Sequence, residues 1–311
     1  MKITKIITRC LALQFNSLIS PSLIVISACE NLARKVGIVA RTDREEAIST
    51  AARIVDRFEK EKFDILLEPS LADLMNRRNS STPLEKMRAD LIVTIGGDGT
   101  ILRTCLRIPK PEPPILAVDM GVRGFLTEIT PERAIDAVER YLKGAYTVER
   151  CSKIASFVGD ERLPDALNEV FVTSRHLAKL LHLRIKKNDD IVMDCRADGV
   201  IIASQVGSTG YAFSAGGPII DLDLDAFVLT PVCPITFIRP IVFSSSSEVT
   251  LELLKPKNAM VVIDGDYQKE IDEKNPFITV RKSEYESSFI RFGGSFYQRL
   301  KARLLFSREE S

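Results

Sequence analysis

The sequence predicts an α/β domain built on a parallel sheet, followed by a β-rich domain and a C-terminal helix that packs back on the first domain. In the first half, short apolar runs alternate with amphipathic stretches at helical spacing, the pattern of a parallel sheet. Beyond about Tyr146 the apolar runs are short and helical periodicity nearly disappears, which favours β structure. The last stretch, Ser295 to Leu305, is amphipathic again.

Chain length is consistent with this division, because 311 residues at about 150 per domain correspond to about two domains. We expect four segments. They are an N-terminal extension (residues 1–33), the α/β domain (34–145), the β-rich domain (146–290) and the C-terminal helix (291–311).

The α/β domain begins with Lys35–Ala40, an apolar run that we expect to be a strand. Thr42 and Asp43 follow it and are residue types that cap helices, so an amphipathic helix should start there. The further strands expected in this domain are Phe63–Leu67, Leu91–Ile95 and Ile115–Val118.

A well-marked helix closes the first domain, with Thr130 as cap, Pro131 at the first helical position and Gly144 as the stop. The β-rich domain then shows short β-type runs. These include Ile154–Val158, Glu169–Thr173, Ile191–Met193, Val200–Ala203, Glu248–Leu254, Met260–Ile263 and Phe277–Val280.

Composition excludes several classes of protein. The chain is 45% hydrophobic and 27% charged, which indicates an ordinary globular protein rather than a disordered or multi-spanning one. Its 43 basic and 42 acidic residues leave a net charge of +1, so no global field favours nucleic acid or an anionic membrane as a partner.

Cysteine usage favours a reducing compartment, and hence the cytoplasm. The six cysteines are scattered without a Cys-x-x-Cys pair, and only two histidines accompany them, so we expect neither a structural zinc nor a disulfide framework. One feature points elsewhere: the uncharged stretch from Cys10 to Cys29, after three basic residues, resembles a bacterial lipoprotein signal. Because polar residues interrupt it, we favour an extension ahead of a cytoplasmic domain.

The most informative motif is Gly96-Gly97-Asp98-Gly99-Thr100, between an apolar strand and a helix that we expect from Ile101 to Arg107. Glycines permit close backbone approach, so successive amides at a helix N-terminus can bind a phosphate. The carboxylate among them has two candidate roles: it holds Mg²⁺ on a nucleotide, or it takes the proton from an attacking hydroxyl. The alternative without a function is a tight strand-to-helix turn that carries an exposed aspartate.

Competing phosphate motifs are absent. The chain has no Gly-x4-Gly-Lys-Ser/Thr sequence, and Leu102 stands where a dinucleotide fingerprint requires its third glycine. A P-loop ATPase and a Rossmann dehydrogenase therefore lose support. A second glycine-rich stretch, Asp198 to Tyr211 followed by Ser214 to Pro218, offers hydroxyl and amide donors with little bulk, which suits either an extended ligand or an ordinary loop.

Taken together, these motifs resemble those of NAD kinases in the same order. They are Gly96–Thr100, Gly124-Phe125-Leu126, Asn168-Glu169, Asp198–Tyr211 and Asp264-Gly265. The resemblance covers about residues 35–304. Gly-Gly-Asp-Gly-Thr alone is shared with diacylglycerol, sphingosine and 6-phosphofructokinases, whereas the Asn-Glu pair and the Gly-Ser-Thr-x-Tyr stretch narrow the family.

The resemblance implies phosphoryl transfer from ATP or polyphosphate, with Mg²⁺ or another divalent cation, to the 2′-hydroxyl of the adenosine ribose of NAD. It makes Asp98 the catalytic acid-base residue, with Asp264 a second candidate for the base. It assigns no residue as a metal ligand. The nucleotide-binding residues that it implies are Gly96, Gly97, Gly99, Thr100, Arg103, Phe125, Asn168, Glu169, Arg196, Asp198, Thr209, Tyr211, Ser214 and Asp264. It also implies a homodimer or homotetramer, because relatives can draw pocket residues from a neighbouring subunit.

Several of these residues also have a purely structural interpretation, with no role in binding: Asn168-Glu169 as a polar turn, Phe125 as a core residue, and Asp264-Gly265 as a hairpin turn. The chain also departs from the family. It has Gln205-Val206 where Thr-Pro is usual, Gly210 where alanine is usual, Ile235 where histidine is common and Asp119 where asparagine is frequent, and it adds Arg123 near the presumed phosphate path. Two other functions remain open at this point: a lipid kinase sharing the glycine motif, and a dinucleotide-binding module without turnover.

Overall fold

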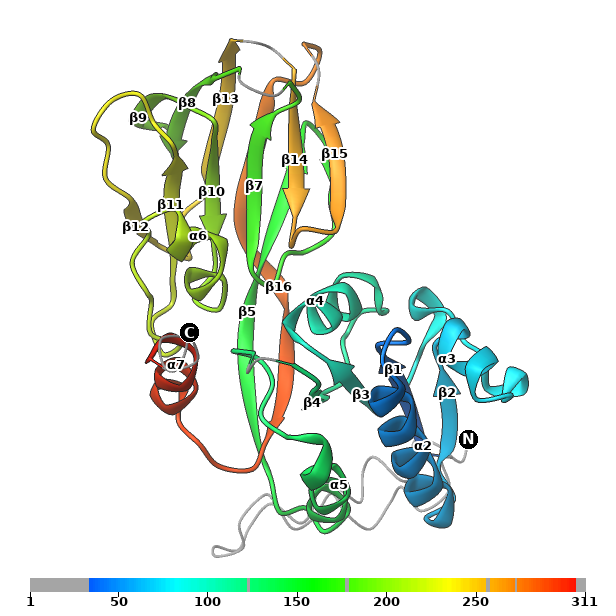
Figure 1. Cartoon of the computed structure of the whole chain (residues 1–311). Helices are drawn as coiled ribbons and strands as arrows, with labels where there is room; N and C mark the ends of the chain where they lie inside the picture. Colours follow the sequence, from blue (N-terminus) through cyan, green and yellow to red (C-terminus); the bar gives the residue numbers. More distant parts are fainter. Residues whose placement is uncertain (1–33, 122–123, 177–178, 256–257, 272, 306–311) are drawn as a thin grey trace, which may run out of the picture. The chain divides into compact units, whose positions relative to one another are not determined.

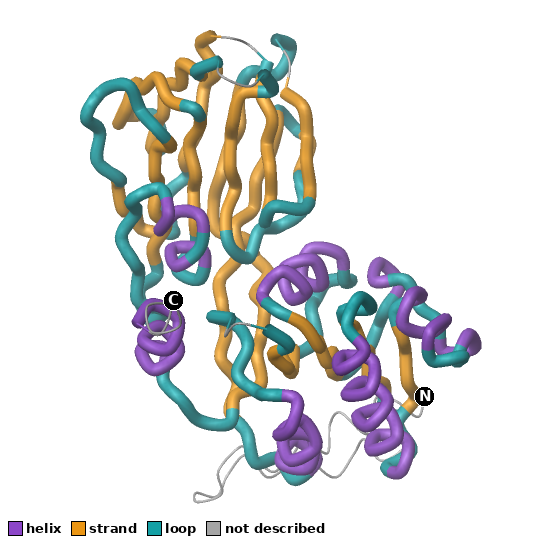
Figure 2. The backbone as a smooth tube through the Cα atoms, in the orientation of Figure 1, coloured by secondary structure: helices purple, strands orange, loops and turns teal. Residues whose placement is uncertain are grey.

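The computed structural model describes residues 34–121, 124–176, 179–255, 258–271 and 273–305. The predicted N-terminal extension and Arg123 lie outside these residues. Figures 1 and 2 show helices gathered around one group of strands and a second region made almost entirely of strands.

The predicted parallel sheet is confirmed. Its strands pair in the order β2-β1-β3-β4, all parallel. The strands are β1 (Lys35–Ala40), β2 (Asp64–Leu67), β3 (Leu91–Gly96) and β4 (Ile115–Asp119). The helices of this region are α2 (Glu45–Lys60), α3 (Pro69–Leu74), α4 (Asp98–Arg107) and α5 (Ala134–Leu142), with short 3-10 turns η3 (Arg78–Ser80), η4 (Leu84–Lys86) and η5 (Pro131–Arg133). Helix α2 buries Ile54 and Phe58 against the sheet, as its apolar spacing predicts.

One predicted helix cap is wrong and another is confirmed in position. Helix α2 starts at Glu45 after Arg44 and has no side-chain cap, because the Asp43 carboxylate binds the Arg41 guanidinium instead. Thr130 is the N-cap residue of the 3-10 turn η5, which begins at Pro131 and runs directly into α5, although the Thr130 side chain makes no capping hydrogen bond. The predicted stop at Gly144 is confirmed by its φ of 70°, a conformation that glycine adopts without strain.

The helix expected from Ile101 begins three residues earlier, at Asp98. Glycine is a poor helix former, but aspartate is favourable in the first turn, Gly97 serves as the cap and the Thr100 amide donates to the Gly97 carbonyl. Asp98 is therefore the first residue of α4, at the end of the helix that carries the unpaired amides.

The second region is β-rich, as predicted, and each of the seven runs named from the sequence falls in a strand. The strands are β5 (Thr147–Val158), β6 (Glu161–Arg162), β7 (Glu169–Ser174), β8 (Leu181–Lys187), β9 (Asp190–Ala197), β10 (Gly199–Ala203), β11 (Ala226–Val232), β12 (Ile241–Ser244), β13 (Val249–Lys255), β14 (Ala259–Ile263), β15 (Tyr267–Ile271) and β16 (Phe277–Arg291). Two short helical pieces interrupt it, η6 (Gly207–Thr209) and α6 (Tyr211–Ser214).

These strands form two sheets that share a core. β16 pairs antiparallel with β5 over most of its length and, at Phe289, in parallel with β4, so the parallel sheet continues into an antiparallel one. The resulting order is β2-β1-β3-β4-β16-β13-β8-β9, while the second sheet runs β12-β11-β10-β7-β14-β15. Buried side chains from both sheets, among them Leu183 and Phe227, meet in one apolar cluster.

The C-terminal helix α7 (Phe296–Leu305) packs back on the first region, as predicted. The Phe296 ring meets the Phe125 ring edge-on at 5.1 Å between centroids, and Leu300 joins the same cluster as Val39. The aromatic contact adds about 0.5–1.5 kcal/mol to the burial itself. No helix among the described residues has both the length and the apolar character that crossing a membrane requires.

Candidate active site

The glycine motif lines an open cavity of about 570 Å³ at the N-terminus of α4. Its walls come from the carboxyl ends of β1, β2 and β3, the edge at which α/β sheets bind ligands. They comprise Ala40, Arg41, Thr42, Asp43, Glu68, Ser70, Gly97, Gly99, Thr100 and Arg103. Gly97 and Gly99 leave open space where a Cβ would stand, whereas a Cβ at Gly96 would lie 2.2 Å from Thr100 Oγ1. Two glycines thus admit a ligand, and the third permits the turn.

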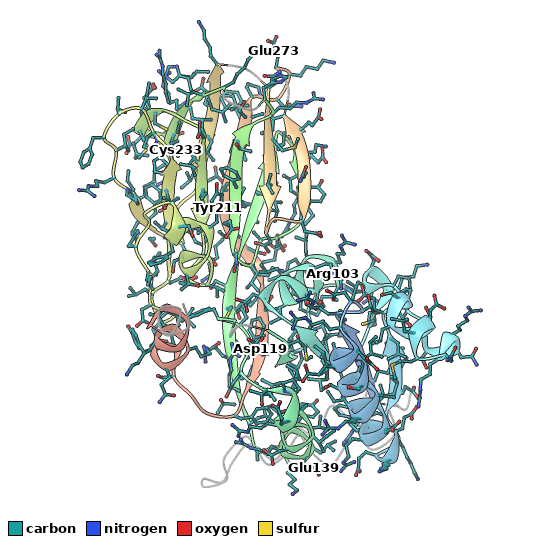
Figure 3. All side chains as sticks on the ribbon, in the orientation of Figure 1. Arg103, Asp119, Glu139, Tyr211, Cys233 and Glu273 are labelled. Carbon is teal, nitrogen blue, oxygen red and sulfur yellow. The ribbon has the colours of Figure 1, made fainter. Side chains whose placement is uncertain are left out.

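Both arginines of this cavity are already paired with carboxylates. Arg103, which Figure 3 labels on α4, forms a two-pronged ion pair with Glu68, with 3.0 Å between Nη2 and Glu68 Oε2. Arg41 binds Asp43 in the same way, with 3.0 Å between Nε and Oδ1. Sequence reasoning found Arg103 but missed Arg41, Asp43 and Glu68. These three residues directly follow two strands that the sequence predicts, and this position was the signal that could have identified them.

Asp98 is bound to the segment after β4. Its Oδ2 accepts the Phe125 amide at 2.9 Å and its Oδ1 accepts the Leu126 amide at 3.0 Å. Gly124 makes this approach possible, because a Cβ there would lie 2.3 Å from Asp98 Oδ1. The motif and the Gly-Phe-Leu segment, 26 residues apart, therefore form one unit.

Asp119 lies beside this unit at the end of β4, next to Gly96 in the register of β3 and β4. Burial raises the pKa of Asp119, and the neighbouring Asp98 carboxylate adds to the rise. Phe125 itself is buried, and its ring packs on Phe296 and Arg299. Within this chain it is therefore a core residue, the simpler of the two roles considered for it.

A second polar centre forms around Asn168 and Glu169, at the start of β7. The buried Asp264 carboxylate accepts the amides of Leu167, Asn168 and Glu169 at 2.7, 2.8 and 3.0 Å. Asp264 stands with Gly265 in the hairpin between β14 and β15, where both residues have positive φ, as the hairpin reading predicts. The carboxylate therefore fixes the backbone of the Asn-Glu pair.

The oxygens of that pair are left without partners. Asn168 Oδ1 and Glu169 Oε2 are buried and accept no hydrogen bond. Burial, and secondarily the Asp264 carboxylate, raises the pKa of Glu169 to about 8. A buried polar oxygen without a donor costs about 1–3 kcal/mol, so this centre is prepared for a ligand that supplies donors.

The second glycine-rich stretch covers the same centre. A Cβ at Gly207 would lie 2.0 Å from the Asn168 carbonyl oxygen, whereas one at Gly210 would stand 3.6 Å from Glu169 Oε2, an ordinary contact. The Ser204 amide donates to the Asn168 carbonyl at 2.9 Å. The buried Thr209 follows in η6, its hydroxyl donating to the Val206 carbonyl.

Tyr211 and Ser214 lie on α6 beside this stretch, and both are exposed (Figure 3 labels Tyr211). The Tyr211 ring meets the Phe171 ring edge-on at 5.2 Å between centroids. Three stretches singled out in the sequence, 168–169, 204–211 and 264–265, therefore meet in one place.

Arg196 and Asp198 are not brought to this centre within one chain. Antiparallel pairing of β7 and β10 sets Gly199 opposite Thr173 and Ala203 opposite Glu169. Four residues of strand separate the two ends, which corresponds to roughly 13 Å. Asp198 therefore lies at the far end of β10 from the Asn-Glu pair.

The far end of α4 is anchored by a buried ion pair that sequence reasoning missed. Lys153 on β5 and Glu112 are both fully buried, with 2.5 Å between Nζ and Oε1. Lys153 Nζ also donates to the Cys105 carbonyl in the last turn of α4, at 3.0 Å. A cation at a helix C-terminus is favourable, and this one holds in place the helix whose first residue is Asp98.

Three of the cysteines in the described part of the chain, Cys105, Cys151 and Cys195, are free and buried, whereas Cys233 is free and exposed. Within that same part, no group of three or more His, Cys, Asp and Glu side chains is arranged to hold a metal ion.

A parallel sheet with a glycine-rich turn and an open, arginine-lined cavity at its carboxyl edge defines a nucleotide-binding α/β protein. Family models for the ATP-NAD kinase N-terminal and C-terminal domains match residues 36–146 and 167–292. The chain belongs to the ATP-NAD kinase family.

Individual relatives agree with this assignment. The chain is 42% identical to an NAD kinase of Methanothermobacter thermautotrophicus over 87% of its own length and 96% of the relative's. A crystal structure of an NAD kinase from Archaeoglobus fulgidus in complex with ATP matches with a TM-score of 0.69 and 31% identity, over 86% of this chain and 98% of that one. Yeast NADH kinase complexed with NADH, at 21% identity and a TM-score of 0.79 over 91% and 90%, shares the fold. These matches support neither the lipid-kinase nor the binding-module alternative.

Proposed function

We propose that this chain transfers a phosphoryl group from ATP, or from polyphosphate, to the 2′-hydroxyl of the adenosine ribose of NAD, giving NADP. The observation that carries the proposal is the cavity at the N-terminus of α4, where the positive end of the helix, open space beside Gly97 and Gly99 and two arginines suit a chain of phosphates. The ATP bound by the Archaeoglobus fulgidus relative supports ATP as the donor.

The acceptor would bind at the Asn168-Glu169 centre. A ribose or an adenine amino group carries the donors that Asn168 Oδ1 and Glu169 Oε2 lack, so binding would remove the cost of two buried unpaired oxygens. Gly207, Thr209, Tyr211 and Ser214 would border the same ligand. Because the Asp264 carboxylate accepts hydrogen bonds from three backbone amides, we assign Asp264 the role of positioning Asn168 and Glu169.

Asp98 would take the proton from the ribose hydroxyl as the phosphorus is transferred. A secondary hydroxyl is a poor nucleophile until its proton leaves, and general base catalysis contributes about 10² to 10⁴ in rate. Positioning and charge neutralisation supply the remainder in phosphoryl transfer. The amides of Phe125 and Leu126 fix the direction of the Asp98 carboxylate.

A divalent cation such as Mg²⁺ would enter with the nucleotide. Mg²⁺ prefers one or two carboxylates together with substrate phosphates and waters. The donor set fits this mode, because the cavity offers the separate carboxylates of Asp43 and Glu68, each shared with an arginine, rather than a cage. When bound, the ion would neutralise phosphate charge.

We further propose a homodimer or homotetramer in which a second subunit brings Arg196 and Asp198 to the NAD site, since one chain leaves them at the far end of β10. Exposed apolar side chains near Arg196, those of Ile235 and Phe237, support an interface on this face. We also propose that the α/β domain ends near residue 145 and the β-rich domain near residue 290; family models that end at residues 146 and 292 support these limits. The free cysteines support a cytoplasmic location.

A coupled assay tests the proposal. Purified protein incubated with NAD, ATP and Mg²⁺ should form NADP, which an NADP-specific dehydrogenase reports. Polyphosphate in place of ATP identifies the donor. Stabilisation by NAD without NADP from any donor would mean a binding module, and transfer to diacylglycerol or a sphingoid base instead would mean a lipid kinase.

A further inference from the structure

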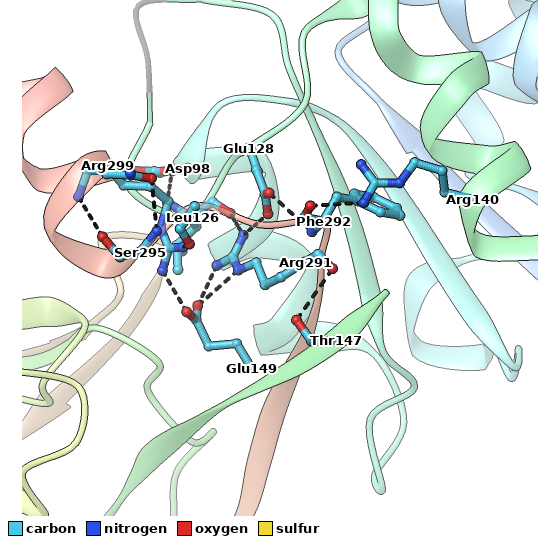
Figure 4. A network of polar contacts seen from close by, with 12 residues as sticks. Asp98, Leu126, Glu128, Arg140, Thr147, Glu149, Arg291, Phe292, Ser295 and Arg299 are labelled. Atoms are coloured by element: carbon cyan, nitrogen blue, oxygen red, sulfur yellow. Dashed lines mark hydrogen bonds and ion pairs between the residues drawn. The ribbon is translucent and has the colours of Figure 1, made fainter. Parts of the chain in front are cut away.

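The segment Phe125-Leu126, whose amides hold Asp98, is itself held on its opposite side by a buried charged network (Figure 4). Arg291 at the end of β16, only 4% exposed, donates from Nη1 to the Leu126 carbonyl at 2.8 Å. Leu126 therefore donates to Asp98 with its amide and accepts from Arg291 with its carbonyl.

Glu149 on β5 connects Arg291 to the C-terminal helix. Its Oε1 accepts Nε and Nη2 of Arg291 at 3.0 and 2.6 Å, and its Oε2 accepts Arg299 Nη2 at 2.6 Å. Burial alone would raise the pKa of Glu149, but the two guanidinium groups outweigh it and hold that pKa below its usual range. Glu149 is thus a charged bridge between two arginines.

Helix α7 completes the enclosure of the segment. The Arg299 guanidinium lies over the Phe125 ring at 5.8 Å, while the Phe296 ring meets its edge. Phe125 and Leu126 are both 2% exposed. Strands β5 and β16 and helix α7 therefore restrain the dipeptide from one side, and the Asp98 carboxylate binds it from the other.

We propose that Arg291, Glu149 and Arg299 are positioning residues for Asp98, so that the C-terminal helix sets the geometry of the catalytic carboxylate. The inference rests on the catalytic role proposed for Asp98. Displacements of about 1 Å in a catalytic group can cost about 100-fold in rate, so a network that fixes its two hydrogen-bond donors affects turnover without touching substrate.

The test uses Arg299→Met, which keeps apolar bulk over Phe125 but loses the bond to Glu149. Steady-state kinetics of the full chain should show kcat lowered about 10-fold, with KM for NAD and for ATP changed less than about two-fold. Arg299→Lys, which keeps the charge, should recover most of the loss. If Arg299→Met does not fold, Glu149→Gln serves as the second test variant. Its side-chain amide places an N–H donor opposite a guanidinium donor, so one of the two arginine contacts is lost.

Arg140→Met is the matched control. Arg140 donates to the carbonyl of Phe292, the residue after Arg291, at 2.9 Å and lies over the Phe292 ring. It makes no hydrogen bond to the 124–126 segment. Its kcat should stay at the wild-type value. A loss equal to that of Arg299→Met would overturn the inference in favour of general loosening.

Asp98→Asn separates the two proposals. In the Asp98→Asn background, Arg299→Met should cause little further loss of kcat, because residues that act through one group are not additive. An inactive Asp98→Asn beside an Arg299→Met variant with normal kcat overturns this inference alone. Near-normal turnover of Asp98→Asn overturns the role of Asp98, and the inference with it.

Discussion

The donor cavity and the Asn-Glu centre treat their polar groups in opposite ways. In the cavity at α4 each arginine is paired with a carboxylate of the same chain, and the space beside Gly97 and Gly99 is open. At the centre near β7, two buried oxygens have no partner and the pKa of Glu169 is raised. On the proposed function, the cavity would exchange existing ion pairs for contacts with phosphate, whereas the centre would gain hydrogen bonds that it lacks.

This difference has a physical reason. A triphosphate brings its own charge and cation, and carboxylates of the same chain hold the two half-buried arginines of the cavity in a fixed geometry before it binds. A ribose or an adenine brings neutral donors, for which a buried, desolvated acceptor gives more discrimination than an exposed one.

The largest expected effect is that of Asp98→Asn. Turnover should fall by about 10² to 10⁴, because the proposed proton acceptor is lost, while NAD and ATP should still bind. The variant amide also turns one donor toward the Phe125 or Leu126 amide, so a modest fall in melting temperature should accompany the loss. Coupled NADP formation and thermal unfolding measure these two effects; normal turnover would remove Asp98 from the reaction.

Gly207→Ala should break the centre and leave the cavity intact. Its Cβ would meet the Asn168 carbonyl oxygen at 2.0 Å, so the backbone of the Asn-Glu pair must shift, at a cost of about 1–3 kcal/mol. We expect KM for NAD to rise about 10-fold or more, with KM for ATP nearly unchanged. Gly210→Ala is the control: its Cβ would lie 3.3 Å from the Gly207 carbonyl oxygen, a tight contact that a shift of a few tenths of an ångström relieves, so KM for NAD should change far less than in Gly207→Ala.

Arg103→Met should instead weaken the cavity at α4 and leave the Asn-Glu centre intact. It removes a phosphate ligand and leaves the Glu68 carboxylate, with a side chain only 11% exposed, facing the phosphates alone. Charge-assisted hydrogen bonds contribute about 1.5–3 kcal/mol, so KM for ATP should rise roughly 10-fold or more, with KM for NAD unchanged. The same change at Arg57, paired with Glu139 outside the cavity, should leave both constants unaltered.

Glu169→Gln should have the smallest effect, and one that depends on pH. Because the pKa of Glu169 is about 8 in the folded chain against 4.5 ordinarily, the folded state keeps a proton that the unfolded state releases. Stability contributed by this group is therefore complete below about pH 4.5 and declines as the pH rises toward about 8. Glutamine lacks the decline, so the melting temperature of the variant relative to the wild type should rise between about pH 5 and pH 9. A constant difference would mean that Glu169 is ionised throughout.

Much of the fold could be predicted because its signals are local. Apolar runs such as Leu91–Ile95 are strands whatever they pair with, and the spacing of Ile54 and Phe58 makes α2 amphipathic before it meets a sheet. Strands β8 and β15, which were not among the named runs, have lysines, arginines or glutamates on their solvent side and owe their state to their neighbours in the sheet. The predicted cap at Asp43 was wrong because its carboxylate binds Arg41, two residues earlier in the chain, rather than the helix amides.

The candidate site divides along the same line. By itself the sequence determined the chemistry: the glycines that admit phosphates, the carboxylate among them and the Asn-Glu pair, since each depends on residue type and spacing. Only the tertiary structure decided which groups meet, because hydrogen bonds between distant segments are set by strand register and packing. It joined Asp98 to Leu126, Leu126 to Arg291, and Asp264 to the Asn-Glu pair, and it left Asp198 at the far end of its strand.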